Sequence, residues 1–146
     1  MQSHRRDSEV QEQGCWALRN LCSDNIGDIE RKAGQDGGIE AVVEALKAHK
    51  KEAGVQAQGC AALANLCVCD ENVRRAGNCG GVDAVVQALK AHKSLHVQEA
   101  GRGALKNLIE GNEKNTRRAA AAGGMDVILS LTAKSEPVGK GNARLR

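Results

Sequence analysis

Two short motifs recur along the chain at a nearly fixed spacing, and this repetition constrains the fold more than any other feature. The motif V-Q-x-x-G-x-x-A-L-x-N-L has copies 45 and 42 residues apart, beginning at Val10, Val55 and Val97. A second motif starts with a pair of glycines, and its copies are 43 residues apart, beginning at Gly37, Gly80 and Gly123. Two coupled motifs at one period indicate a chain built from stacked supersecondary units.

The apolar residues within each copy are spaced as on one face of an α-helix. In the first copy this stripe contains Val10, Gly14, Leu18 and Leu21. The segment after each glycine pair has the same period. A shorter helix is expected between the two motifs, over residues 25–34, 71–77 and 112–121. The glycine pairs end this short helix, because glycine readily adopts the left-handed conformation of a helix C-cap.

The composition favours helices and excludes several functions. Only 1% of the 146 residues are aromatic, with one Trp and no Tyr or Phe, which disfavours a β-sandwich or barrel. Binding of nucleic acid by base stacking needs aromatic side chains. A net charge of +3 is small for a surface that follows a phosphate backbone. We therefore expect no nucleic-acid partner.

The sequence favours a protein of the cytoplasm or nucleus with no membrane span. The segment MQSHRRDSEV lacks the apolar stretch of a secretory signal, and no apolar run approaches the ~20 residues that span a bilayer. The six cysteines fall mostly within helical patterns. This usage is expected for reduced thiols rather than for a disulfide framework.

The glycine-pair start, the helices AVVEALKAH and AVVQALKAH, and the VQxxGxxALxNL helices together resemble the armadillo repeat. HEAT repeats are the alternative, but they lack the short first helix and the Asn-Leu ending. The resemblance implies an all-α, right-handed solenoid of three-helix repeats, with about three repeat equivalents. Its expected parts are an N-terminal flank (1–9), a partial repeat (10–23), two repeats (24–68 and 69–110), a second partial repeat (111–134) and a flexible tail (135–146).

One departure from the family pattern recurs in the third helix. Gly14, Gly59 and Gly101 stand where armadillo repeats usually have alanine. A glycine in a helix interior costs ~1 kcal/mol relative to alanine. We therefore expect a close contact with another helix at these positions.

The chain contains no motif that predicts catalysis. It has no Walker loop, no dinucleotide-binding glycine pattern and no HExxH zinc motif, so we expect neither an enzyme nor a cofactor. His49 and His92 occupy equivalent positions, which favours a structural role. Cys67, Cys69 and Cys79 offer three thiols and His92 a fourth ligand, but their spacing matches no zinc module. We expect packed thiols and no metal.

A row of asparagines marks the candidate binding surface. Asn20, Asn65 and Asn107 recur at one position, on the helix face opposite the apolar stripe. The third helices of armadillo proteins line a concave groove, so the resemblance implies recognition of an extended peptide by these carboxamides. Helices ~8–10 Å apart would meet such a peptide about every three residues. The alternative is that each Asn bonds carbonyl groups near its helix end. The predicted groove comprises Gln13, Trp16, Asn20, Gln58, Asn65 and Asn107.

Trp16 adds a second resemblance within this row. The stretch W-A-L-R-N is similar to the Trp-x-x-x-Asn signature of importin-α, and the wider stretch is similar to β-catenin. An indole gives an anchor and a face for a cation. Ala61 and Gly103 replace this Trp in the other copies and the net charge is positive, so a nuclear-import adaptor is the weaker interpretation. Packing of Trp16 against another repeat is the structural alternative.

A second row is basic and recurs in the short helix every 43 residues. It comprises Arg31, Lys32, Arg74, Arg75, Arg117 and Arg118. Stacking would align these cations along one edge, where an acidic partner segment would fit. A solvated face with local ion pairs is the alternative.

The last predicted helix carries an apolar set that no third helix follows to cover: Met125, Ile128, Leu129 and Leu131. Burial of one Leu or Ile side chain is worth ~1.5–3 kcal/mol, so we expect this end to associate with the first helix of another copy. Three functions remain open. The first is a non-catalytic interaction module that binds an extended protein segment in the groove. The second is a structural building block that assembles end to end, and the third is an accessory array attached to an enzyme, with no activity in this chain.

Overall fold

The computed structural model describes residues 2–24 and 27–135, and within these ranges the chain is helical with no β-strand. The prediction of an all-α chain is therefore confirmed. A 3₁₀-helix over Gln2–His4 comes first. The α-helices are α1 (Ser8–Leu21), α2 (Asp28–Gln35), α3 (Gly38–Ala48), α4 (Ala53–Leu66), α5 (Asp70–Asn78), α6 (Gly81–Ala91), α7 (Leu95–Ile109), α8 (Glu113–Ala121) and α9 (Met125–Ser135). None of these helices is long and apolar enough to cross a bilayer.

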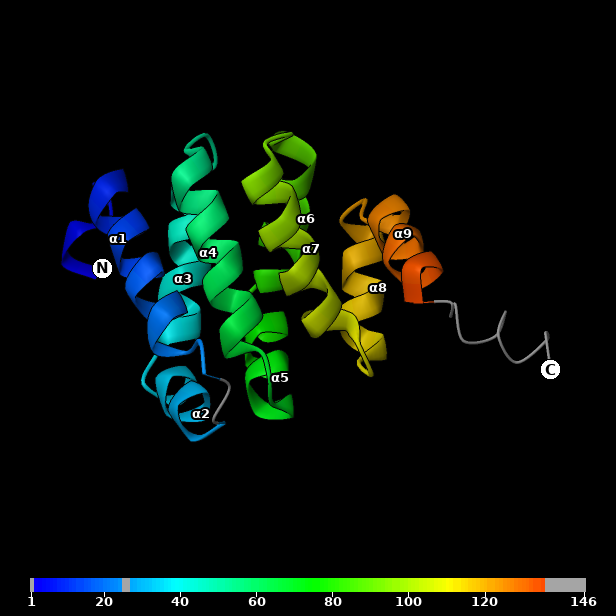
Figure 1. Cartoon of the computed structure of the whole chain (residues 1–146), viewed down its shortest axis with the longest axis horizontal. Helices are drawn as coiled ribbons and strands as arrows, with labels where there is room; N and C mark the ends of the chain where they lie inside the picture. Colours follow the sequence, from blue (N-terminus) through cyan, green and yellow to red (C-terminus); the bar gives the residue numbers. More distant parts are fainter. Residues whose placement is uncertain (1, 25–26, 136–146) are drawn as a thin grey trace.

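The helices recur in the order short, long, long. Helices α2–α4 form the first unit, α5–α7 the second, and α8 and α9 the third, while α1 precedes them. The units follow one another along the long axis of the molecule, with α1 at one end and α9 at the other (Figure 1). Helix α4 packs against both α1 and α7, so these three helices lie side by side (Figure 1).

Each glycine pair turns the chain from a short helix into the next long one. Gly80 has a φ of 91°, a left-handed conformation that most residues adopt only under strain. Gly81 is needed for a different reason: a Cβ atom there would lie 2.9 Å from the carbonyl oxygen of Ala76. The first glycine of the pair adopts the left-handed conformation, and the second leaves room for the carbonyl oxygen at the end of the short helix.

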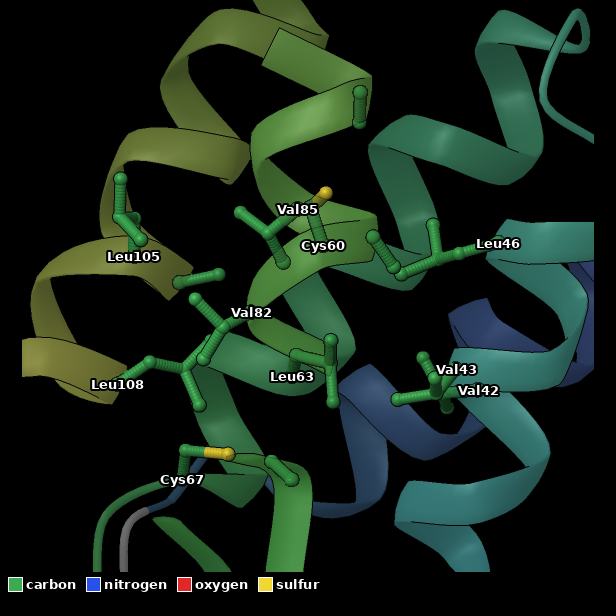
Figure 2. Packing of buried hydrophobic residues seen from close by; sticks show 14 of the residues in the cluster. Val42, Val43, Leu46, Cys60, Leu63, Cys67, Val82, Val85, Leu105 and Leu108 are labelled. Carbon is green, nitrogen blue, oxygen red and sulfur yellow. The ribbon is translucent and has the colours of Figure 1, made fainter. Parts of the chain in front are cut away.

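Small residues let the helices of one unit approach closely. Figure 2 shows Cys60 and Leu63 of α4 between the side chains of α3 on one side and of α7 on the other. A Cβ atom on Gly59 would lie 2.7 Å from Cδ2 of Leu46, and one on Gly101 would lie 2.7 Å from Cδ2 of Leu89. The predicted close contacts are therefore confirmed at these two positions.

Four of the six cysteines belong to this core. Cys15, Cys22, Cys60 and Cys67 are buried, and all six thiols are free. Burial raises the pKa of Cys15, Cys60 and Cys67 to about 12, because a thiolate would lose its hydration. Cys69 and Cys79 are half-buried. These buried thiols pack as small apolar side chains, as the sequence predicts.

The N-terminal flank is more closely tied to the fold than predicted. Helix α1 begins at Ser8, inside the predicted flank, because the Asp7 carboxylate accepts hydrogen bonds from the amides of Glu9 and Val10. Nε2 of Gln11 donates to the carbonyl oxygen of His4 over 2.9 Å. Gln56 and Gln98 make the same bond to His49 and His92. Residues 4–11 thus repeat the connection that precedes α4 and α7.

The apolar end of the chain also differs from the prediction. Ile128 is only 7% exposed, and Leu131 packs against the core, because both face α7 and α8. Met125 and Leu129 lie one helical turn apart and remain 49% and 57% exposed. Only these two residues form an open apolar surface on α9. The predicted tail from residue 135 overlaps the last residue of α9, and residues 136–146 lie outside the described ranges.

Candidate functional site

The predicted groove residues lie on three adjacent helices, which we call the α1–α4–α7 face. Gln13, Trp16 and Asn20 are exposed on α1. The remaining three are half-buried on the neighbouring helices: Gln58, Asn65 and Asn107. The structure therefore brings this part of the sequence prediction together on one surface, along the row of helices in Figure 1.

Two of the asparagines join neighbouring helices. Nδ2 of Asn65 donates to the carbonyl oxygen of Arg19 on α1, and Nδ2 of Asn107 donates to that of Ala64 on α4, both over 2.8 Å. Each amide has a second N–H and an oxygen for which no partner is found within the described residues. Asn65 and Asn107 thus bond carbonyl groups, as the alternative interpretation expects, but the carbonyl belongs to a neighbouring helix. The rest of each amide can still bind a peptide group.

Asn20 differs from the other two asparagines. It is exposed on α1, and its side chain makes no hydrogen bond within residues 2–24 and 27–135. Asn20 thus has no part in the bonds that join neighbouring helices within the described residues, and it can be substituted without breaking such a bond.

A hollow of about 530 Å³ opens on this face between α4 and α7. At the positions equivalent to Trp16, α4 has Ala61 and α7 has Gly103, and these small residues leave the space that an indole would fill. A Cβ atom on Gly103 would meet nothing within 4 Å, so packing does not require this mid-helix glycine. The lining comprises Arg19, Ala57, Gln58, Ala61, Ala64, Asn65, His96, Glu99, Ala100 and Gly103. Methyl groups beside polar side chains suit an extended segment with both backbone and apolar contacts.

Charge is balanced around this hollow. Nη1 of Arg19 donates to Oε1 of Gln58 over 3.1 Å, and Glu99 and His96 lie on the opposite side. The lining thus carries both a cation and an anion. Recognition here would rest on amides and shape more than on charge.

The basic row of the short helices is largely occupied by the chain's own acceptors. Arg31 pairs with Asp28 over 2.8 Å, and Lys32 with Asp36 over 2.7 Å. Arg75 bonds Glu40 and Glu71, Arg117 bonds Glu113, and Arg118 donates to Asn115 and Asn78. Within the part of the chain that the structure describes, only Arg74 has no such partner. Local pairs engage most of these cations, which favours the alternative of a solvated face, and the edge for an acidic partner stays a prediction.

The repeat-equivalent histidines make structural bonds. Nε2 of His49 lies 2.7 Å from the carbonyl oxygen of Arg5, and Nε2 of His92 lies 2.7 Å from that of Lys50. A search of residues 2–24 and 27–135 finds no cluster of three or more His, Cys, Asp or Glu side chains suited to a metal ion.

Sequence reasoning missed a second amide pair that joins the units. Nδ2 of Asn72 donates to the carbonyl oxygens of Leu66 and Glu30, each over 2.8 Å. Asn115 makes the equivalent bonds to Leu108 and Val73. The signal was available, because both residues precede a Val-Arg or Thr-Arg pair at a spacing of 43 residues.

Comparison with models of protein families, with curated proteins and with solved structures finds no match. What this chain does is therefore inferred from its own residues and their geometry.

Proposed function

We propose that this chain is a non-catalytic protein-interaction module of the armadillo type, which acts in the cytoplasm or nucleus. It binds an extended segment of a partner protein across the α1–α4–α7 face. The observation that carries the proposal is the row of three equivalent asparagines on adjacent helices, beside a hollow that packing alone does not require. A backbone that is read through amides needs no particular side chain at each step.

Peptide binding can be measured through the fluorescence of Trp16. It is the only Trp of the chain and is 49% exposed on this face, so its fluorescence reports a segment bound beside it. A phage-displayed library of random peptides is enriched on the immobilised protein, and the most enriched peptide is titrated while Trp16 emission is recorded. We expect a saturable change in emission.

Two variants separate binding from stability. Asn20→Ala should weaken peptide binding about tenfold and leave the melting temperature unchanged, because Asn20 holds no other helix. Asn65→Ala should weaken binding and also lower the melting temperature, because its bond to Arg19 is lost. Gln35→Ala on α2, an exposed carboxamide outside the face, is the control. Failure to enrich any peptide, or equal affinity of all three variants, would count against the proposal.

The exposed pair Met125 and Leu129 favours a second function, that of a building block. In that case the face stays unused and copies associate through α9. Light scattering over a dilution series distinguishes the two, since a peptide-binding monomer keeps one mass at all concentrations.

A further inference from the structure

The connections between the two long helices of successive units are tied together along one edge. The α3–α4 and α6–α7 connections lie at the same edge, at the top of Figure 1. Nε2 of His92 lies 2.7 Å from the carbonyl oxygen of Lys50, and Nε2 of His49 lies 2.7 Å from that of Arg5. Because a carbonyl oxygen only accepts, each Nε2 carries the hydrogen. Each connection is thereby held next to the one before it.

This edge is basic, and we call it the loop edge. Its cations are Arg5, Arg6, Lys50, Lys51 and Lys93, all of which are exposed. Arg5 pairs with Glu44 over 2.7 Å. The other four make no ion pair with any residue that the structure describes. The acidic residues of these connections are Asp7, which caps α1, and Glu52. The loop edge therefore keeps free positive charge, in contrast to the short helices.

A hollow of about 350 Å³ lies between α3 and α6 and includes Lys50 in its lining. Its floor is apolar and contains Leu46, Ala84 and Ala88. Asp83 lines it as well, about two turns of α6 away from the loop edge. The hollow thus has Lys50 near the loop edge and Asp83 near the start of α6.

The hollow exists because Ala84 and Ala88 in its floor have small side chains. In α9 the positions of Ala84 and Ala88 are held by Val127 and Leu131, and both of these pack against the core. The equivalent residues of α3, Ala41 and Ala45, are alanines too, so the gap between α3 and α6 follows from two small side chains at positions where α9 has larger ones. Lys47 also lines it, and its Nζ donates to the carbonyl oxygen of Cys79, next to the first residues of α6, over 2.9 Å. Lys50 is the lining cation whose side chain makes no hydrogen bond within the described residues.

We propose that the loop edge and this hollow together bind an acidic protein segment. The segment places one bulky apolar side chain over Ala84 and Ala88, and its carboxylates contact Lys50 and Lys93. Apart from Gln56 of α4, the hollow is lined by residues of α3, α6 and the α3–α4 connection, and it shares no lining residue with the hollow of the α1–α4–α7 face, so the proposal stands independently of the proposed function.

The test is the binding of short fluorescein-labelled peptides, followed by fluorescence anisotropy. The probe repeats Glu-Glu-Leu, and a second peptide has serine in place of leucine. We expect the leucine peptide to bind about tenfold more tightly, because only leucine fills the hollow. Its binding should weaken as salt is added, since the loop edge is exposed. Vesicles of phosphatidylserine and a short oligothymidylate test other anions.

A matched pair of charge reversals locates the site. Lys50→Glu should weaken binding of the leucine peptide about tenfold. Arg74→Glu makes the same change of charge at another exposed cation without an ion pair, on α5, and should leave binding unchanged. Ala88→Leu, which copies Leu131, should fill the hollow and make the two peptides bind equally.

Several outcomes would overturn the proposal. These are no binding of the leucine peptide, equal effects of the two charge reversals, or tighter binding of the vesicles or the oligonucleotide. Circular dichroism checks the fold of Ala88→Leu. If that variant does not fold, the comparison of Lys50→Glu with Arg74→Glu decides, because both positions are exposed.

Discussion

Glu30 places a carboxylate where the equivalent residues of the other units are Val73 and Thr116. It is 1% exposed, and its Oε2 has no hydrogen-bond partner within the described ranges. Burying such an oxygen costs free energy, so we expect Glu30→Val to raise the free energy of unfolding by about 1–3 kcal/mol. Urea denaturation measures the change. Glu30→Gln, which removes only the charge, should give a smaller gain; a loss with both variants would show that the carboxylate stabilises the fold.

The buried thiols predict a loss of stability at high pH. Cys15, Cys60 and Cys67 have a pKa of about 12 in the folded chain, against 9.0 as the ordinary value. Below pH 9 both states keep these protons. Above it only the unfolded chain releases them, so the free energy of unfolding falls, by up to ~1.4 kcal/mol per pH unit for each thiol. Urea denaturation between pH 8 and pH 11 should show a shallower fall for Cys60→Ala. Equal slopes would contradict this prediction.

At the scale of the element, one amide holds α5 against two neighbours. Asn72 bonds the last turn of α4 and the carbonyl oxygen of Glu30 on α2. A Cβ atom on Gly34 would lie 2.1 Å from Oδ1 of Asn72. We expect Gly34→Ala to destabilise the natural chain by about 1 kcal/mol or more and to stabilise the Asn72→Ala chain, where the space is free. A double-mutant cycle in urea measures this reversal of sign.

Gly103→Ala is the control for that cycle. A Cβ atom there meets nothing within 4 Å, so alanine should add about 1 kcal/mol of helix stability with or without Asn72. A Gly34→Ala effect of one sign in both backgrounds would mean that Asn72 does not cause the crowding.

At the scale of the whole molecule, substitutions on the buried and on the exposed side of α9 should change the free energy of unfolding by different amounts. Ile128→Ala should lower the free energy of unfolding by about 2–4 kcal/mol, because Ile128 is 7% exposed and packs within the core. Leu129→Lys, at a residue 57% exposed, should change it by less than about 0.5 kcal/mol. If copies associate through this end, Leu129→Lys should also abolish the association seen by light scattering. Equal destabilisation by both variants would contradict the observed orientation of α9.

Local periodicity determined much of this molecule from the sequence alone. Spacings of three and four residues placed the apolar stripes, and the glycine pairs marked where each short helix ends. The same period put Asn20, Asn65 and Asn107 on one face, since each repeat has the same helical phase. In α1 the stripe was only partly right, because Leu21 is 57% exposed while Cys15, which was not in the stripe, is buried. These features depend on residues within one or two turns of one another.

The tertiary structure alone decided which polar groups remain free and which are already paired. Asn65 bonds a carbonyl group 46 residues away, and Asn72 bonds one 42 residues away. Arg75 pairs with Glu40 of the preceding unit, and this pairing could not be read from the basic row in the sequence. Ile128 and Leu129 are neighbours in sequence, yet only Ile128 faces α7 and α8. The reason is distance: hydrogen bonds and ion pairs form over about 3–4 Å, and which distant groups come that close depends on how the helices pack.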